Sequence, residues 1–299
     1  MTETIDALWE AIDNGQKQPL TIDYPAPSEE NETHANRLEM PQAIRKSMRK
    51  AIVEFDLLAP GDKVLIGLSG GKDSTLLMHA MAELTRHLPW PVELEVMHVD
   101  LGFKQEGDMD YTPLAQAAQS AGLPFHVLRM DLSEDILHNA EQSPCSRCSY
   151  WRRAMIHNYA RQKGFGKVAF AHHYDDAVET WLMGLLYSGQ LGTFMPKTFL
   201  DRTGVTVIRP FVYIRERDII GAVHKLGIAG IPSPCPLDGN TKRAYTKDLI
   251  VKLCRENTQV FEHLTSAMRE GRGAELWPPK PERTWLREKS QEFWSGRDD

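Results

Sequence analysis

The sequence predicts an α/β protein whose parallel, twisted sheet is covered by helices on both faces, as in Rossmann-like folds. Short apolar runs alternate with stretches of helical spacing, which is the pattern of strands joined by crossover helices. A glycine-rich turn follows the first of these runs and opens a helix, as phosphate-binding turns do. The 299 residues suffice for a full core, and no apolar run approaches the roughly 20 residues of a membrane span.

From residue 41 onward the predicted elements follow one another in a regular order. A first helix is predicted because apolar residues recur at helical spacing at Ile44, Met48 and Ile52, with basic residues between them. Short apolar runs predict strands at Val64–Leu68, Leu94–Val99, Phe125–Met130, Lys167–Ala171 and Val205–Ile208. Helical spacing predicts helices at Thr75–His87, Thr112–Ala121, Ser146–Gln162, Ala177–Tyr187, Glu216–Leu226 and Thr241–Arg255.

The charged residues are distributed unevenly along the chain. The net charge is −6, and residues 1–40 alone carry nine acidic and two basic side chains. We expect this segment to be a mobile or loosely docked acidic arm, residues 41–270 to form the folded domain, and residues 271–299 to be a tail. Four cysteines are too few for a disulfide scaffold, which favours a reducing, cytoplasmic setting and metal or catalytic roles for the thiols.

One stretch of the nearly neutral body is strongly basic. Residues 142–174 contain no acidic side chain and six basic ones: Arg147, Arg152, Arg153, Arg161, Lys163 and Lys167. Such a stretch either binds a phosphate backbone or is a solvated helix face, and charge alone does not distinguish the two interpretations.

The glycine-rich turn has the composition of a phosphate-binding loop. Gly70 and Gly71 allow successive backbone N–H groups to converge on an anion at the positive end of the following helix. The loop is not a Walker loop, because its glycines are spaced differently and Asp73 follows Lys72. The segment S-G-G-K-D-S (69–74) instead resembles the loop of ATP pyrophosphatases, which split ATP between its α and β phosphates. The alternative is a structural strand–helix turn with a capping Ser or Asp.

Two cysteines form a Cys-x-x-Cys turn ahead of a predicted helix. Cys145 and Cys148 lie where the positive end of that helix favours thiolates. A metal needs more ligands, and Cys235, between two prolines, is the natural third, whereas Cys254 lies in an amphipathic stretch as a packed thiol. Three cysteines fit an iron–sulfur cluster with one open iron, or zinc completed by His or Asp. A redox-active pair and an inert pair are the alternatives.

A second polar cluster, A-H-H-Y-D-D at residues 171–176, follows a predicted strand and opens a helix. Asp175 and Asp176 are adjacent carboxylates that can hold Mg²⁺ against a triphosphate, or one can act as an acid or base near the reacting group. The alternative is a capping Asp beside histidines with satisfied hydrogen bonds. Ligands bind at the carboxyl ends of parallel strands, so we expect this cluster, the glycine loop, the segment 98–100 and the Cys-x-x-Cys turn at one rim of the sheet.

Together these motifs resemble the TtcA/TtuA family of tRNA thiolation enzymes, and in particular its 2-thiocytidine synthetases. The resemblance covers about residues 45–270 and rests on six segments: S-G-G-K-D-S (69–74), P-C-S-R-C (144–148), A-H-H-Y-D-D (171–176), Y-S-G-Q-L-G (187–192), I-R-P-F-V-Y-I-R-E-R-D-I (208–219) and I-P-S-P-C (231–235). It implies an adenine nucleotide α-hydrolase-like fold, an enzyme that uses ATP and Mg²⁺, a [4Fe-4S] cluster, tRNA as the substrate and a homodimer.

The resemblance also implies roles for single residues. The residues that it assigns to ATP and Mg²⁺ are Ser69, Gly70, Gly71, Lys72, Asp73, Ser74 and Asp176. Those assigned to catalysis are Lys72, Arg152 and Asp175, and those assigned to the cluster are Cys145, Cys148 and Cys235. ATP would adenylate the C2 oxygen of a tRNA cytidine. Sulfur from hydrosulfide or from a cysteine desulfurase persulfide would then enter through the open iron and replace AMP.

One position departs from the family pattern. Asp238 stands where the 2-thiocytidine enzymes carry a further cysteine, in P-C-x-x-C. That thiol is not one of the three cluster ligands, so we expect the cluster to be kept and a sulfur-relay role at this position to be lost. Two other functions are compatible with the residues alone. One is an adenylating enzyme that acts on a small pyrimidine or carboxamide, and the other is a redox-responsive regulator that binds nucleotides.

Overall fold

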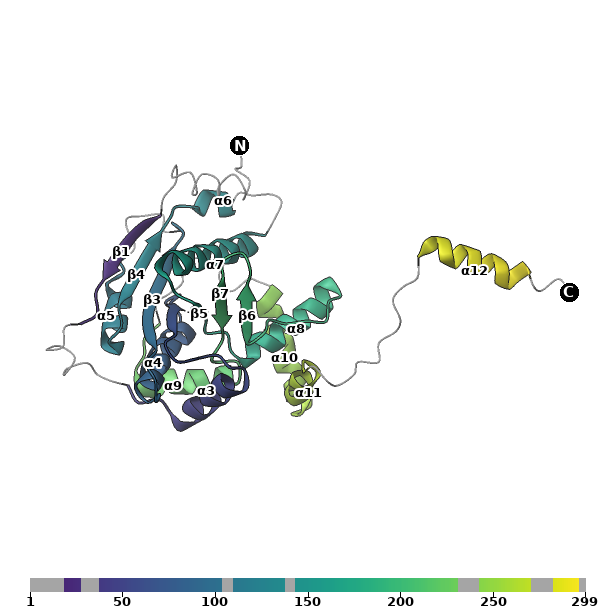
Figure 1. Ribbon diagram of the computed structural model, residues 1–299. Helices are drawn as coiled ribbons and strands as arrows, with labels where there is room; N and C mark the ends of the chain where they lie inside the picture. The colour runs from purple at the N-terminus through teal and green to yellow at the C-terminus, as the bar shows by residue number, and fades with distance from the viewer. Residues whose placement is uncertain are drawn as a thin grey trace.

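The fold is a single sheet with helices on both of its faces. The computed structural model describes residues 19–27, 38–103, 110–137, 143–230, 242–269 and 282–295. The described strands form a seven-stranded sheet in the order β1-β4-β3-β2-β5-β7-β6 (Figure 1). They are β1 (Leu20–Tyr24), β2 (Lys63–Gly67), β3 (Glu93–Asp100), β4 (Phe125–Arg129), β5 (Lys167–Ala169), β6 (Lys197–Leu200) and β7 (Val205–Ile208).

The five inner strands are parallel, which confirms the predicted parallel α/β sheet. Both edge strands are antiparallel to their neighbours and make the sheet mixed: β1 pairs with β4, and β6 pairs with β7. The sequence analysis missed both of them. Strand β1 lies within the predicted acidic arm, and its pairing from Leu20 with Arg129 to Tyr24 with Phe125 docks that part of the arm against the sheet.

The connections place the candidate site at a switch in strand order. From β2 the chain crosses to β3 and then to β4 on one side, whereas β5 lies on the other side of β2. The loops that leave the carboxyl ends of β2 and β5 therefore diverge, and in open α/β sheets ligands bind in the crevice at such a point. The glycine loop follows β2, and the A-H-H-Y-D-D segment follows β5.

Helices pack on the two faces of the sheet and beside its β6 edge. One face carries α3 (Gln42–Glu54), α4 (Lys72–Arg86), α5 (Thr112–Ala121) and α9 (Glu216–Leu226), and the other face carries α7 (Pro144–Lys163) after the short α6 (Ser133–Leu137). A third group of helices packs together beside the β6 edge (Figure 1): α8 (Tyr174–Ser188), α10 (Lys242–Glu256) and α11 (Val260–Ala267). In the predicted tail, α12 (Arg283–Ser295) is exposed over residues 283–291.

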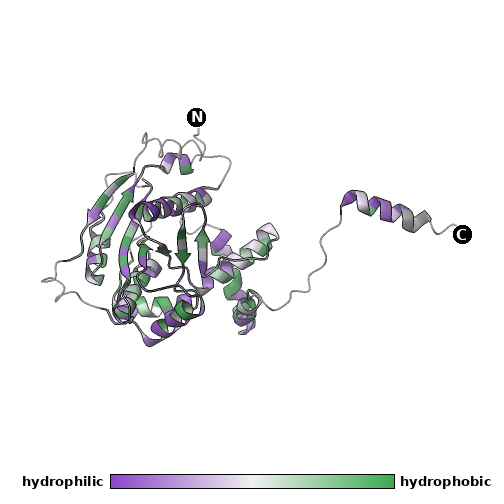
Figure 2. Ribbon diagram, in the orientation of Figure 1, coloured by the Kyte–Doolittle hydropathy of each residue, from purple (hydrophilic) through white to green (hydrophobic). Residues whose placement is uncertain are grey.

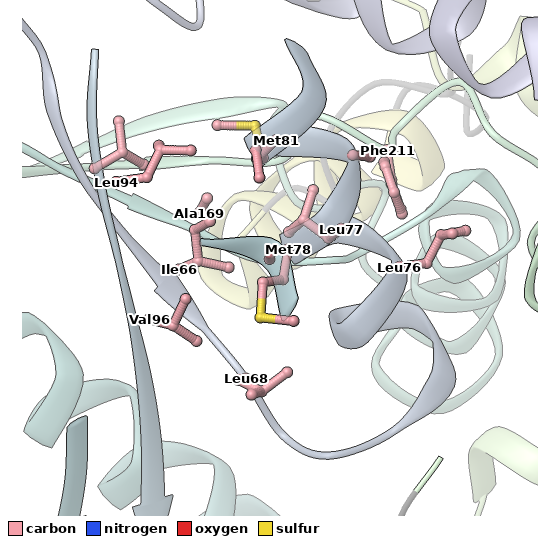
Figure 3. Close-up of a cluster of buried hydrophobic side chains, with 14 of the residues drawn as sticks. Ile66, Leu68, Leu76, Leu77, Met78, Met81, Leu94, Val96, Ala169 and Phe211 are labelled. Atoms are coloured by element: carbon pink, nitrogen blue, oxygen red, sulfur yellow. The ribbon is translucent and has the colours of Figure 1, made fainter. Parts of the chain in front are cut away.

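Alternation along the strands divides the core into two layers. Val64 and Ile66 of β2 pack into the layer under α4, whereas Leu65 between them packs into the layer under α7. Figure 3 shows the first layer, where Leu77 and Met81 of α4 meet Ile66 and neighbouring strand residues. Figure 2 shows α7 mostly in hydrophilic colours, because only one side of this helix meets the core. Among the described residues, no helix is long and apolar enough to cross a membrane.

The predicted helices are all present, and two match residue by residue. Helices α5 and α9 end at Gly122 and Gly227, whose left-handed conformations (φ +76° and +64°) end a helix without strain. The basic stretch 142–174 divides between core and surface. Arg147 is buried, and Lys167 is half-buried against Asp62, with Nζ and Oδ2 2.6 Å apart. Its exposed basic side chains are Arg153, Arg161 and Lys163.

Candidate active site

The glycine loop joins β2 to α4 through a turn that favours glycine. Gly70 has φ +88°, which other residues rarely adopt. Ser69 and Ser74 close the loop, because their hydroxyl oxygens lie 3.0 Å apart and the Ser69 N–H donates to Ser74 Oγ at 3.1 Å. Helix α4 begins after Gly71 without a side-chain cap. The N–H groups of its first turn form the positive end of the helix dipole. Because no side chain caps them, they can bind a phosphate.

Lys72 links this loop to helices α9 and α10. Its Nζ lies 3.1 Å from Asp73 Oδ2 and 3.2 Å from Glu216 Oε1, and Glu216 also pairs with Lys247 at 2.6 Å. Burial lowers the pKa of Lys72, but the carboxylates of Asp73 and Glu216 outweigh it and raise the pKa above its ordinary value. The other oxygen of Asp73, Oδ1, is buried without a hydrogen-bond partner among the described residues. Such an oxygen fits a hard cation such as Mg²⁺.

Asp175, the predicted catalytic carboxylate, is held by the start of α9. Its two oxygens accept hydrogen bonds from Arg215 Nε at 3.2 Å, and Oδ2 also accepts one from the Glu216 N–H at 2.8 Å. Arg215 in turn lies over the ring of Phe261, 3.2 Å from its centroid. Since Glu216 binds Lys72 through its side chain and Asp175 through its backbone, one connected network runs from the glycine loop to the first turn of α8. The catalytic role of Asp175 stays a prediction.

Asp176 and His173 form a reciprocal cap at the start of α8. The His173 N–H donates to Asp176 Oδ2 at 3.0 Å, and the Asp176 N–H donates to His173 Nδ1 at 3.3 Å. Arg243 of α10 also donates to Asp176 Oδ1 at 3.2 Å. The sequence offered a capping Asp as the alternative to Mg²⁺ binding, whereas the cap found here has His173 at the N-cap position and Asp176 as the third residue of the helix. Metal binding by Asp176 stays a prediction. A metal ion there would have to share the Asp176 oxygens with His173 and Arg243.

The two cysteines of the Cys-x-x-Cys turn open α7 and line a pocket of about 360 Å³. Cys145 is exposed and Cys148 is half-buried. The residues that line the pocket beside them include Phe103, Arg152, Arg153, Phe170 and His172. The described residues contain no group of three His, Cys, Asp or Glu that could hold a metal. Cys235, the predicted third ligand, and Asp238 lie outside the described residues, so the ligand set stays a prediction.

Several nitrogen atoms of basic side chains near this pocket are buried without a hydrogen-bond partner in the described part of the chain. They are Arg147 Nε and Nη2, Arg152 Nε, His172 Nδ1 and, on the strand side, Arg209 Nε. Burial first, and then neighbouring arginines, lower the pKa of His172 to about 3, so its ring is neutral. Unpartnered donors beside two thiols, at the positive end of a helix, fit an anionic group such as thiolate-bound iron and sulfide.

The cysteine pocket and the glycine loop share a wall. Phe170 lines the pocket and packs on the end of β2 so closely that a β-carbon on Gly67 would lie 2.8 Å from its ring. Gly230 also approaches the loop, since a β-carbon on it would lie 3.5 Å from the Lys72 N atom. His98 of β3 contacts the loop as well, with Nδ1 2.8 Å from the Leu68 carbonyl oxygen. The expected gathering of these segments at the carboxyl ends of the strands is therefore confirmed for the glycine loop, His98 and the Cys-x-x-Cys turn.

The sequence analysis gave no role to several charged residues that the structure brings to the site. Arg215 and Glu216 lie within the segment I-R-P-F-V-Y-I-R-E-R-D-I, and Arg243 and Lys247 lie in the predicted basic helix 241–255. The available signal was weak, because charged residues at a helix start are common on any protein surface. Their partners lie far away in the sequence, and only the fold brings them together.

The chain matches the family model of the PP-loop domain over residues 40–252. It is 31% identical over 244 residues to a tRNA-cytidine(32) 2-sulfurtransferase of Shewanella amazonensis, which covers 81% of this chain and 75% of the relative. The enzyme of the same name from Bdellovibrio bacteriovorus is 32% identical over 238 residues, with 78% and 91% covered. Among solved structures, the U34-tRNA thiolase NcsA of Methanococcus maripaludis, determined with its [4Fe-4S] cluster, superposes with a TM-score of 0.62 at 20% identity over 75% of this chain and 77% of its own.

The fold and the glycine loop define a PP-loop protein, and the structural likeness to the thiolase supports that fold. The chain therefore belongs to the PP-loop family and, by its identity to relatives that it covers over most of their length, to the family of the tRNA-cytidine(32) 2-sulfurtransferases.

Proposed function

We propose that this protein is an ATP-dependent tRNA sulfurtransferase that converts a cytidine of tRNA to 2-thiocytidine, as the name of its relatives states for cytidine 32. The observation that carries the proposal is the contact between Phe170 of the cysteine pocket and Gly67, just before the glycine loop. A loop suited to the phosphates of ATP and a pocket lined by two thiols meet where Phe170 packs on Gly67. A base bound at this contact is within reach of both activation and sulfur delivery.

Activation is assigned to the glycine-loop side. The C2 oxygen of cytidine attacks the α phosphorus of ATP, the bond to the β phosphate breaks, and pyrophosphate leaves. The N–H groups of residues 69–74 and Lys72 would stabilise the charge that develops on pyrophosphate. Asp73, through its unpartnered Oδ1, and Asp176 would hold Mg²⁺. Lys72 would exchange its contact with Glu216 for a phosphate oxygen, and Lys247 would keep Glu216 neutralised.

Sulfur delivery is assigned to the cysteine side. Cys145, Cys148 and Cys235 would hold a [4Fe-4S] cluster, which when bound supplies an iron position open to a sulfur species. Hydrosulfide forms the new bond at C2 with a sulfur lone pair and gives up its proton, and AMP leaves with the electrons of the C–O bond. A desulfurase persulfide would serve only after a second thiol reduces its S–S bond and becomes a disulfide, which delivers the outer sulfur as hydrosulfide. The first turn of α7 and the buried guanidinium of Arg147 would stabilise the thiolates. Arg152 and Asp175 are assigned to the phosphates and to the reacting base.

The activity is tested by anaerobic turnover. Iron-loaded protein is mixed with ATP, Mg²⁺, sulfide and tRNA that lacks the modification, and the digested tRNA is analysed by mass spectrometry. We expect 2-thiocytidine, and one AMP and one pyrophosphate for each. A triple variant at Cys145, Cys148 and Cys235, each changed to Ala, should lose the product. Cys254→Ala is the matched control, because Cys254 of α10 packs against the apolar cluster of α8, α10 and α11 and is not one of the proposed cluster ligands. Iron-loaded protein that turns over no tRNA under these conditions would exclude the proposed function.

We further propose a cytoplasmic homodimer in which residues 41–270 form the catalytic domain between the arm and the tail. The resemblance to the thiolation family suggests the dimer. Light scattering measures it directly, since the monomer has a mass of 33.9 kDa and the dimer twice that.

A further inference from the structure

A second cavity lies beside the cysteine pocket and has no role in the function proposed above. It measures about 520 Å³ and lies between one side of α7 and the turn that joins β6 to β7. We call it the α7 groove, and the residues that matter for its chemistry are Tyr150, His157, Arg161, Phe199 and Arg202. Its size is within the range of about 300–1,000 Å³ that is usual for ligand sites.

The α7 groove combines exposed aromatic and guanidinium groups. Phe199 projects from the edge strand β6 with 62% of its surface exposed, so its ring is accessible for stacking. Arg161 of α7 and Arg202 of the turn are both exposed along the same groove, and Asp201 is the acidic side chain among its lining residues. Aromatic rings beside cationic side chains are the two components with which proteins bind single-stranded nucleic acid, by stacking and by phosphate contact.

His157 lines the groove as a further aromatic ring. Its Nε2 is buried without a partner among the described residues. Burial first, and then Arg153 and Arg209, lower the pKa of His157 to about 4. The ring is therefore neutral at pH 7, with one nitrogen that donates and one that accepts.

The groove adjoins the cysteine pocket. The ring of His157 lies 6.1 Å from that of Phe170, and Phe170 is 5.9 Å from His172, which lines the cysteine pocket with it. Both cavities also use neighbouring sides of α7, since Ser149 and Arg153 line the pocket whereas Tyr150 and Ala154 line the groove. A polynucleotide with one base in the pocket would therefore have its neighbouring nucleotide at the groove.

We infer that the α7 groove binds the RNA strand next to the modified nucleotide, by stacking a base on Phe199 and by holding phosphates with Arg161 and Arg202. The inference rests on the proposed function, since it needs an RNA substrate. It identifies the part of the basic stretch that contacts RNA: Arg161, and not the buried Arg147 or the paired Lys167.

The test measures RNA affinity directly. Binding of a fluorescent tRNA transcript is followed by anisotropy at several salt concentrations, without ATP. We expect Phe199→Ala to weaken binding about 10-fold through the loss of one stacked base. The double variant Arg161→Glu and Arg202→Glu should weaken it more. It should also lower the slope of log K against log salt by at least about 1.4, since each of the two phosphates that the arginines neutralise contributes about 0.7 to that slope.

Two matched controls lie on other surfaces. Tyr245 of α10 is 63% exposed, so Tyr245→Ala removes an aromatic ring as exposed as Phe199. The side chain of Arg217 of α9 is 76% exposed, so Arg217→Glu repeats the charge change away from the groove. Both should bind tRNA within about twofold of the wild type. Unchanged melting temperatures would show that all four proteins are folded.

Three outcomes would overturn the inference. Groove variants that bind tRNA as the wild type does would exclude the groove as an RNA site and leave the proposed function intact. Wild-type protein that binds no tRNA would overturn the inference and the proposed function together. Groove variants that bind tRNA normally but lose thiolation with a persulfide-carrying protein donor, while retaining it with free sulfide, would assign the groove to that protein instead.

Discussion

On the glycine-loop side of the candidate site the charged side chains are held in ion pairs, and Asp73 Oδ1 is a buried oxygen that stays open, whereas on the cysteine side several buried nitrogen atoms have no hydrogen-bond partner among the described residues. Lys72 and Lys247 share Glu216, and Asp175 is held by Arg215. Across the wall of Phe170, the described chain leaves polar atoms buried without hydrogen bonds in Arg147, Arg152, His157 and His172. The two sides are adjacent, and they differ in how many of their buried polar atoms have a hydrogen-bond or ion-pair partner.

This difference indicates which side is preformed. A buried polar group without a partner costs about 1–3 kcal/mol of folding free energy. A cluster of such groups therefore destabilises the folded state unless a ligand supplies the missing hydrogen bonds. The paired side can keep its geometry without ATP, and binding there exchanges one partner for another. The cysteine side is expected to gain order and stability when anionic iron and sulfide, or RNA phosphates, supply the missing partners.

The largest expected effect is on the incomplete side. We expect Cys148→Ala to lower the yield of 2-thiocytidine by more than about 100-fold, since loss of a ligand exceeds the 10–100-fold effects of residues that only support a ligand. Binding of ATP, measured by calorimetry, should stay within about twofold, because the glycine loop is held by its own contacts. Cys254→Ala should change neither quantity. A Cys148→Ala protein that failed to bind ATP as well would break the distinction between the two sides.

A smaller effect is expected on the paired side. Lys72→Ala should lower kcat about 100-fold, the usual loss when one donor that stabilises transition-state charge is removed. Lys247→Ala should have a much smaller effect, because Lys247 contacts Glu216 and not the loop. Steady-state rates of AMP release compare the two lysines. Equal losses in both variants would mean that Glu216 and its partners act as one unit, in contrast to the exchange of partners proposed for Lys72.

The next effect is on stability. Arg215→Ala should lower the free energy of unfolding by about 2 kcal/mol, because it leaves Asp175 largely buried without its counterion and removes the contact with Phe261. Urea unfolding at pH 7 measures this free energy. Arg215→Lys should recover only part of the loss, since a lysine cannot make the two-oxygen contact of a guanidinium. If Arg215→Ala were as stable as the wild type but inactive, Asp175 would be held for catalysis and not for folding.

The sequence predicted the inner sheet well and its edges poorly, for physical reasons. Inner strands are buried on both faces, so β2, β3 and β4 are apolar runs that stand out between helices. The edge strands LTIDY and KTFL are short and half-polar, and their antiparallel pairing depends on distant partners. Helix α12 was missed as well, since it lies in a tail whose prolines and charges predict no element.

The candidate site was predictable where one short segment carries the chemistry. The glycine loop and the Cys-x-x-Cys turn are of this kind. The loop follows the end of β2, and the turn opens α7 in a pocket with Phe170, which follows β5. The pairs of Asp175 with Arg215 and of Lys72 with Glu216 were not predictable, because their members are separated by 40 and 144 residues. Nor could composition divide the basic stretch into the buried Arg147 and the exposed Arg161, since burial depends on which side of α7 meets the sheet.

The smallest expected effect concerns His79 of α4, the helix that follows the glycine loop. His79 lies buried in α4, and burial first, then Arg86, lower its pKa to about 4 from the 6.5 of an exposed histidine. The folded state therefore resists protonation while the unfolded chain accepts a proton, so the stability that neutral His79 contributes is complete above pH 6.5 and is lost as the pH falls towards 4. Between pH 7 and pH 5 we expect a loss on the order of 1–2 kcal/mol from this residue. Urea unfolding of His79→Gln at the two pH values should show a correspondingly smaller loss than the wild type, whereas the exposed His224→Gln should match the wild type. If His79→Gln retained the full pH dependence, the acid sensitivity would come from His157 and His172, and therefore from the unpartnered side of the site.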